Sequence, residues 1–432
     1  MNYLLSILFV FLFAFSAYGE DVDSRIKNLE DTLKSQEKAI SEQQRVIEEL
    51  KAEKAQGQAG KNSGGSGGLF GGSALANPNI SLVLDTFFYN SNLSSSGLEG
   101  RTIPGYINAG IEKTKGFNLE SAELFIYAPV DPYFNVYATM PVTDEGIELE
   151  EAYFLTTSLP AGIQVKGGKF KSGFGRINGQ HPHAWDFADS PLIYRAFIGD
   201  EGVTEKGVQL TYLPQLPFYM QLGIEVLQGE NELLFGADAR SGPHAYTAFA
   251  KASFDVGDFS TVLLGPSVMT GKTKTSTIAD DTEFTGDSTL YGFEVTYKWK
   301  PSKTRSFILQ SEYFLRDQKG DLTDTSLDTT DTLKRSQDGA YIQGVYQIGR
   351  CRLGARYDVL DLVRDEYRLG GVEQAFGRRP WRATADAEFN PTEFSRIRLQ
   401  YNYDRSGRDG KTNNEVIVQL TFGIGAHAAH PF

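Results

Sequence analysis

Cysteine, methionine and long apolar runs are scarce in this chain of 432 residues. Cys351 is the only cysteine in the sequence, so a framework of internal disulfides is impossible. The one long apolar run, residues 4–15, is too short to span a bilayer as a helix. Only 40% of the residues are hydrophobic, which is too few for a bundle of membrane helices. These absences exclude a helical transporter.

An excess of positive charge is also missing. The chain has 55 acidic and 42 basic residues, which gives a formal net charge of -13. A protein that binds nucleic acid needs a basic surface to neutralise phosphates, so we expect no nucleic-acid partner. The sequence also lacks a Gly-x-Ser-x-Gly elbow, a phosphate-binding Gly-rich loop and a His-Glu-x-x-His motif. We therefore expect that the protein is not an enzyme, with a lipase built from rim Ser and His residues as the open alternative.

The first 19 residues have the pattern of a secretory signal peptide. The apolar run is followed by small residues at Ala17 and Gly19, which predicts a signal peptide over 1–19, with an uncleaved anchor helix as the alternative. No cysteine stands directly after the expected cleavage site, so lipid attachment at that position is excluded. An exported chain with one cysteine suits the bacterial outer membrane, where barrels close without disulfides.

Residues 20–56 show a heptad pattern. Core positions recur with spacings of four and three at Val22, Ile26, Leu29, Leu33, Gln36, Ile40, Gln43, Ile47 and Leu50, and all but the two glutamines are apolar. This spacing predicts a periplasmic coiled coil, with an isolated solvated helix as the alternative. The apolar stripe can be buried only against another copy of the chain or against a partner helix. We expect a homotrimer held through the barrel and the coiled coil. Residues 57–79 are rich in Gly and Ser and predict a flexible linker to a second module.

From residue 80 to the end, apolar and polar residues alternate with a period of two. In one segment Tyr291, Phe293 and Val295 share a face, while Glu294 and Thr296 share the other. Short and long connections also alternate. The pattern predicts an all-β transmembrane antiparallel barrel of about 16 strands over 80–432, with a soluble sandwich as the alternative. The expected strands are 80–89, 118–128, 133–141, 147–157, 163–171, 207–213, 218–228, 245–255, 260–270, 289–300, 305–316, 339–348, 351–361, 381–389, 395–404 and 414–424.

Two stretches of the barrel carry a family resemblance. They are DPYFNVYATM at 131–140 and a region over 150–214 that contains KFKSGFGRINGQHPHAWDFADSPLIYRAFIGDEG. Both resemble the phosphate-selective porin superfamily, and more closely its branch labelled zinc-regulated outer-membrane receptors; residues 159–207 are the most specific part. The resemblance implies an outer-membrane porin, anion traffic and a connection with zinc.

Residues 172–206 form the longest loop expected in the barrel, after the fifth strand. Porin-like barrels fold a loop inward at this position, so we expect a pore constriction here, with an external loop over the mouth as the alternative. Arginines on the thirteenth to fifteenth strands and lysines on the fifth strand are expected on opposite walls. The predicted constriction residues are Lys166, Lys169, Lys171, Arg176, Asp186, Asp189, Arg195, Arg352, Arg356, Arg382, Arg396 and Arg398. A basic wall opposite an acidic loop would sort ions by a transverse field; the arginines could instead pair with Asp358, Asp386 and Glu388.

Four of the five histidines occur as two close pairs, His181 with His183 and His427 with His430. Imidazole is a good Zn²⁺ ligand, and we hypothesise a weakly bound Zn²⁺, with Asp186 and Asp189 completing the loop site. Coincidence or ordinary packing of these histidines is the alternative. We expect no other cofactor.

The combined pattern predicts an outer-membrane porin for passive diffusion of small hydrophilic or ionic solutes. One alternative is an envelope tether, in which the coiled coil contacts the cell wall and the barrel is an anchor. A second is an uptake channel for zinc or another divalent metal. Expected partners are outer-membrane lipid and lipopolysaccharide, two further copies of the chain and, in the tether hypothesis, the cell wall.

Overall fold

The computed structural model describes residues 78–106, 113–200, 202–236, 242–279 and 282–425. All of them belong to a unit that runs from residue 73 to residue 432. The predicted signal peptide, the coiled coil and nearly all of the linker lie outside the described residues, as do His427 and His430. Within the described ranges, no helix is long and apolar enough to cross a membrane.

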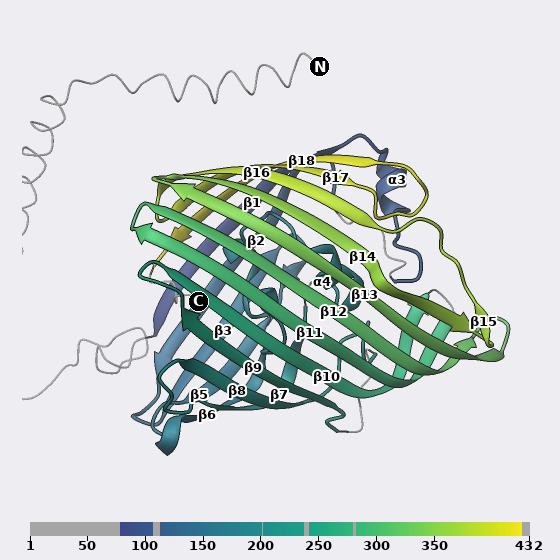
Figure 1. Cartoon of the computed structure of the whole chain (residues 1–432), viewed down its shortest axis with the longest axis horizontal. Helices are drawn as coiled ribbons and strands as arrows, with labels where there is room; N and C mark the ends of the chain where they lie inside the picture. Colours follow the sequence, from purple (N-terminus) through teal and green to yellow (C-terminus); the bar gives the residue numbers. More distant parts are fainter. Residues whose placement is uncertain (1–77, 107–112, 201, 237–241, 280–281, 426–432) are drawn as a thin grey trace, which may run out of the picture. The chain divides into compact units, whose positions relative to one another are not determined.

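The described residues form one closed antiparallel β-barrel (Figure 1). Of its eighteen strands, β4 (Gly146–Ile147) and β15 (Val372–Glu373) have two residues each, and the other sixteen make the wall. Each long strand pairs with its neighbours in the chain, and β1 pairs with β18 from Leu82↔Ile424 to Ser91↔Glu415, which closes the ring. The sixteen are β1 (Asn79–Ser91), β2 (Gly116–Pro129), β3 (Phe134–Thr143), β5 (Glu151–Thr156), β6 (Ile163–Lys171), β7 (Thr204–Tyr212), β8 (Tyr219–Leu227), β9 (Ala245–Asp255), β10 (Ser260–Ala279), β11 (Thr282–Ser302), β12 (Arg305–Asp324), β13 (Thr329–Ile348), β14 (Cys351–Leu369), β16 (Trp381–Thr392), β17 (Ser395–Asp404) and β18 (Asn413–Ile424).

The predicted strand count is confirmed, but the strands β10 to β14 extend beyond their predicted ends. They have 19 to 21 residues each. The long loop expected between the predicted strands 305–316 and 339–348, over 318–338, is wrong, because β12 and β13 continue through most of it and pair as far as Asp324↔Thr329. The added residues are mainly polar, as in QKGDLTD and TTDTLKR. The apolar alternation therefore ends there, whereas backbone hydrogen bonding between neighbouring strands does not depend on side-chain polarity.

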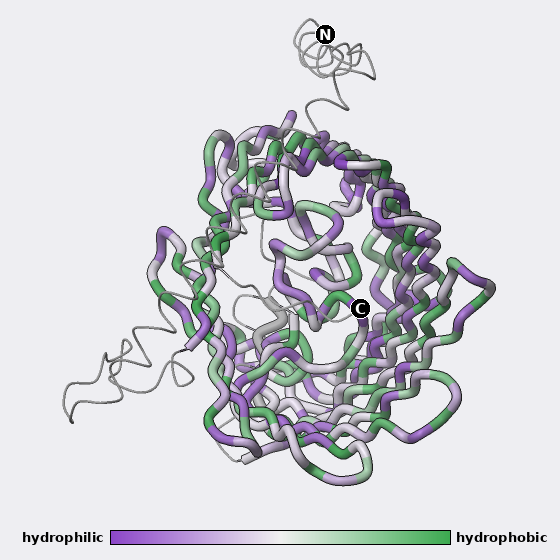
Figure 2. Tube along the Cα trace, turned by 90° about the vertical axis from the view of Figure 1, so that its left-hand side faces the viewer, coloured by the Kyte–Doolittle hydropathy of each residue, from purple (hydrophilic) through white to green (hydrophobic). Residues whose placement is uncertain are grey.

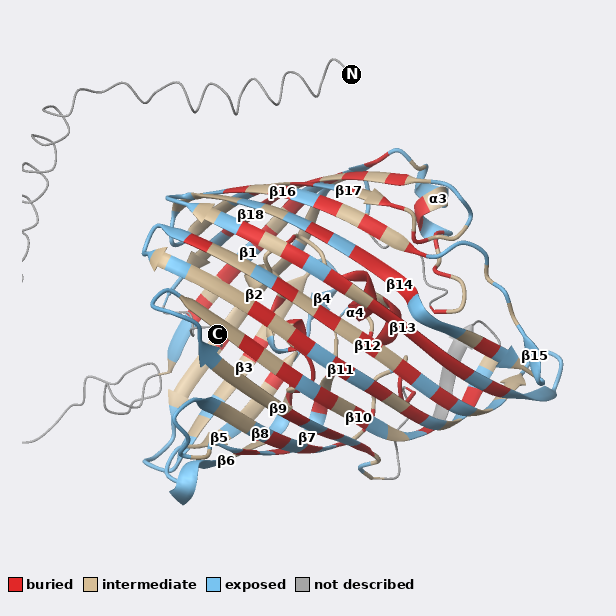
Figure 3. Ribbon diagram, viewed as in Figure 1, coloured by how far each residue is buried: buried red, intermediate tan, exposed pale blue. Residues whose placement is uncertain are grey.

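Inward and outward side chains alternate along the wall as predicted (Figure 3). Tyr291 and Phe293 on β11 are 46% and 45% exposed, and Glu294 between Phe293 and Val295 is buried. The outer face is thus apolar and aromatic while the inner face is polar, which is the arrangement of outer-membrane barrels.

The chain between β6 and β7 folds into the barrel instead of covering its mouth. We call residues 172–203 the lumen loop. It contains η3 (Ile177–Gly179), η4 (Pro182–Ala184) and α4 (Leu192–Phe197), and α4 packs against β12, β13 and β14. Figure 1 shows α4 behind the strands, and Figure 2 shows chain inside the ring. Apolar residues of α4, among them Ile193 and Phe197, are fully buried and form the main core together with Phe314 of β12. A further short helix, α3 (Ser95–Glu99), follows β1.

Candidate functional site

The lumen loop is attached to the arginine-bearing wall through Asp189. Its Oδ1 lies 2.5 Å from Arg356 Nη2, and its Oδ2 lies 2.9 Å from Arg382 Nη1. The side-chain amides of Gln400 and Asn402 donate to the same carboxylate at 2.9 and 2.8 Å. Burial alone would raise the pKa of Asp189, but the charges of Arg382 and Arg356 outweigh it and hold the pKa well below its usual range. Asp189 is therefore an ionised carboxylate that bridges two strands.

The other three wall arginines also bind the loop. Arg398, which is fully buried, donates to the carbonyl oxygen of Trp185 at 2.8 Å and to Glu388 at 2.7 Å. Arg396 donates to the carbonyl oxygen of His183 at 2.7 Å, and Arg352 pairs with Asp186 and with Glu388. The loop thus lies directly on these arginines, and the expectation that it faces them across the lumen is corrected.

The alternative pairing of the arginines with carboxylates of their own wall is also observed. Asp358 Oδ2 lies 3.1 Å from Arg356 Nε and 3.2 Å from Arg382 Nε. These guanidinium groups are therefore neutralised from two sides, by the wall and by the loop. They fix the position of the loop.

On its other side the loop meets three glutamates. His181 Nδ1 lies 3.0 Å from Glu150 Oε2 and 3.5 Å from Glu123 Oε2, and its Nε2 lies 3.0 Å from Glu151 Oε2. Lys171 Nζ approaches Glu150 Oε1 to 2.6 Å. Burial by itself would lower the pKa of His181, but hydrogen bonds to Glu150 and Glu151 raise it to about 10. The pKa of Glu150 is held well below its usual range, because His181 and Lys171 outweigh the effect of burial. The ring of His183 stacks on that of His181, with 5.8 Å between the ring centres. We call Glu123, Glu150, Glu151, His181 and His183 the histidine–glutamate cluster.

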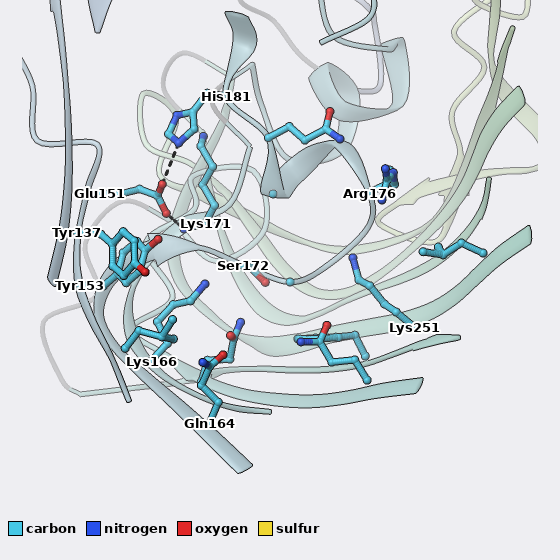
Figure 4. A pocket seen from close by; sticks show the side chains of 18 of the residues that line it. Tyr137, Glu151, Tyr153, Gln164, Lys166, Lys171, Ser172, Arg176, His181 and Lys251 are labelled. Carbon is cyan, nitrogen blue, oxygen red and sulfur yellow. Dashed lines mark hydrogen bonds and ion pairs between the residues drawn. The ribbon is translucent and has the colours of Figure 1, made fainter. Parts of the chain in front are cut away.

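A cavity of about 680 Å³ lies between the loop and the inner faces of β2, β3 and β5 to β10 (Figure 4). Five basic side chains line it, namely Lys166, Lys171, Arg176, His181 and Lys251. Among the described residues in its lining, Glu151 is the one carboxylate. Tyr137 and Tyr153 stack on each other at 5.0 Å at one side of the cavity. The lining of this cavity is therefore basic and partly aromatic.

Lys166 belongs to this cavity and not to an ion pair. Its Nζ lies 5.0 Å from the centre of the Tyr153 ring and 5.2 Å from that of Phe170. Within the part of the chain that the structure describes, no salt bridge of Lys166 is seen, whereas Lys251 pairs with Glu294 at 2.9 Å. The ammonium group of Lys166 thus lines the cavity between two aromatic rings.

The predicted constriction residues fall into separate groups. Lys166, Lys171 and Arg176 line the cavity; the five arginines, Asp186 and Asp189 form the loop–wall contact. Lys169 points elsewhere and bonds to Glu148 and to the carbonyl oxygen of Leu149. Arg195 lies 3.8 Å from Asp200. The alternation along β6 changes near Gly168, which has φ +134° and where a Cβ would lie 2.2 Å from the carbonyl oxygen of Ala152.

Several residues of the site were not predicted from the sequence. Lys251 follows Thr247 and Phe249 at inward positions of β9, so the period of two contained its signal. The glutamates of the cluster had no comparable signal, because their meeting with His181 depends on how the loop enters the barrel. Asp186 and Asp189, predicted to accompany the histidines, bind arginines instead.

Solved structures of outer-membrane proteins resemble this fold. The channel DcaP of Acinetobacter baumannii has a TM-score of 0.52 at 14% identity, covering 82% of this chain and 99% of that chain. OmpT of Vibrio cholerae in its trimer form has a TM-score of 0.50 at 12% identity, with 81% and 99% covered. An anion-selective porin from Comamonas acidovorans has a TM-score of 0.50 at 8% identity, with 81% and 100% covered. These likenesses show that the chain has the fold of outer-membrane porins.

Sequence comparison gives a relative but no described activity. No family model matches the chain, so the branch labelled zinc-regulated receptors stays a prediction. A protein of Aquifex aeolicus (strain VF5), described as uncharacterized, is 42% identical over 380 residues, which cover 82% of this chain and 80% of that protein. The chain therefore belongs to the same family as this uncharacterized Aquifex aeolicus protein.

Proposed function

We propose that the protein is an outer-membrane porin that allows passive diffusion of small hydrophilic solutes and favours anions. The observation that carries this proposal is the cavity of about 680 Å³, lined by five basic side chains and one carboxylate among its described residues. Because the wall arginines bind the lumen loop, the solute path runs on the other side of the loop, along β6 to β9. The constriction lies between the loop and these strands, which carry Lys166 and Lys251. The fold supports the proposal, since it is shared with a channel and with an anion-selective porin.

Lys166→Gln is expected to reduce the preference for anions. Removing one positive charge near the solute path lowers the local anion concentration, and at moderate salt we expect the anion-to-cation permeability ratio to fall roughly twofold. Reversal potentials of the purified protein in a KCl gradient across a planar bilayer measure this ratio. The matched control is Lys206→Gln, because Lys206 is exposed, pairs with Glu230 and does not line the cavity. A cation-selective wild-type pore, or equal ratios in both variants, would remove the proposal.

We also propose a homotrimer in which the barrel and the predicted coiled coil both contribute contacts. Its support is the heptad pattern and the trimer form of the Vibrio cholerae protein with a similar fold. Deleting residues 22–56 is expected to weaken the oligomer and to leave conduction unchanged, because the Gly- and Ser-rich segment separates the two modules. Crosslinking and heat-modified gel mobility report the subunit count, and bilayer recordings report conduction. A purified full-length barrel that stays closed would instead favour the tether hypothesis.

A further inference from the structure

The histidine–glutamate cluster gathers more buried carboxylates than an ordinary ion pair requires. Glu123 on β2 is 3% exposed and Glu151 at the start of β5 is 7% exposed, and both face His181 together with Glu150. Buried carboxylates are stable only when cations or hydrogen bonds compensate their charge. Within the described residues, however, Glu123 Oε1 is buried and has no hydrogen-bond partner. A buried acceptor without a donor, beside a converging set of ligand atoms, points to a missing cation.

Hydrogen bonds within the cluster orient the atoms that could bind a metal ion. With a metal ion in place of its Nδ1 proton, His181 would still donate from Nε2 to Glu151 Oε2 at 3.0 Å and present Nδ1 to Glu150 and Glu123. This is the carboxylate–histidine arrangement that orients metal-bound imidazoles. Lys171 holds the other oxygen of Glu150, Oε1, at 2.6 Å, which leaves Oε2 toward His181.

We propose that Glu123, Glu150 and His181 bind one divalent transition-metal ion, with Glu151 as the orienting partner and a fourth position open to water. One ligand atom from each of the first three residues lies within 4.8 Å of the others. Ligands about 2.0–2.2 Å from a tetrahedral ion lie about 3.3–3.6 Å from one another. The observed separations of 3.0 Å from His181 Nδ1 to Glu150 Oε2 and of 3.5 Å to Glu123 Oε2 are close to that spacing.

The ligand types select the class of ion. One imidazole nitrogen with two carboxylate oxygens suits Zn²⁺ and similar transition metals, whereas Ca²⁺ and Mg²⁺ prefer sites made of oxygen alone. Bound there, the ion would join the lumen loop to β2 and to the chain around β5, opposite the arginines that hold its other side. The inference is independent of the proposed function, because binding can be measured whether or not the barrel conducts.

Zn²⁺ titration of the full-length protein, refolded in detergent and stripped with a chelator, tests the site. Calorimetry should give one Zn²⁺ bound per chain, and an equal concentration of Mg²⁺ should not compete with it. Glu151→Gln removes only the orienting partner and should weaken binding about 10- to 100-fold. Glu123→Gln and His181→Gln remove ligands and should weaken it further. His244→Gln, and a variant with both His427 and His430 replaced by Gln, are the matched controls and should bind as the wild type does.

Equal Zn²⁺ affinity in Glu123→Gln, His181→Gln and the wild type would overturn the proposal. It would also be overturned if binding were lost only in the variant with His427 and His430 replaced by Gln. Should the ligand variants fail to fold, the wild type decides the question with Co²⁺. An intense visible absorption typical of four-coordinate Co²⁺ would support the site, and the weak bands of six-coordinate Co²⁺ would overturn it.

Discussion

Asp189→Ala is expected to release the lumen loop from the barrel wall and to raise the single-channel conductance. Its carboxylate accepts hydrogen bonds from Arg356, Arg382, Gln400 and Asn402. Removing one partner from a buried ion pair typically costs about 3–5 kcal/mol, because the remaining charges stay buried without compensation. Here two guanidinium groups lose the anion that they share and keep only Asp358, so the docked position of the loop is weakened although the contacts of the other arginines remain.

Planar bilayer recordings measure this effect as a larger mean conductance and as added current noise from a moving loop. Asp200→Ala is the matched control. Asp200 lies in the same loop, but its side chain is 71% exposed and its contact with Arg195 is long, at 3.8 Å. The loss of this exposed ion pair should therefore change little. Identical conductance and noise in wild type and Asp189→Ala would mean that this ion-pair set does not hold the loop.

Phe197→Ala is expected to loosen the same loop through lost packing. Phe197 of α4 is fully buried, contacts Tyr106 and Phe314 at ring distances of 5.3 and 6.4 Å, and lies under the guanidinium of Arg316 at 5.1 Å. Truncating a buried phenylalanine typically costs about 3–5 kcal/mol, because apolar contacts are lost and a cavity remains. The cost should appear in the free energy of opening of the loop, since α4 is the element that carries this side chain.

Hydrogen exchange of the backbone amides in residues 172–203 reports that opening free energy. Phe254→Ala provides the control, because Phe254 lies on the outer face, is 38% exposed and contacts Phe218 at 4.8 Å. It should leave the protection of the loop unchanged. If Phe197→Ala leaves the protection unchanged as well, or if both variants lower it equally, apolar docking of α4 is not what holds the loop inside.

The sequence by itself determined the strands and their two faces. Strand structure repeats every two residues, so the alternation of Tyr291 and Phe293 with Glu294 is a local signal that needs no knowledge of distant parts. It placed β6, β9 and β17 at their observed bounds. The alternation did not predict the ends of β10 to β14 that lie beyond the expected strands. Many residues there are polar, which weakens the apolar signal, while the backbone pairing continues.

Only the tertiary structure decided which charges meet. Asp189 and Arg382 are 193 residues apart, and Glu123 and His181 are 58 positions apart in the numbering, so no local pattern relates them. The sequence indicated a loop, arginines and histidines at the right positions. Ring closure between β1 and β18 and the entry of the loop at β6 then placed the arginines under the loop, the glutamates beside the histidines and the lysines along the open cavity. Electrostatic contacts depend on distance in space, which the period of a strand does not encode.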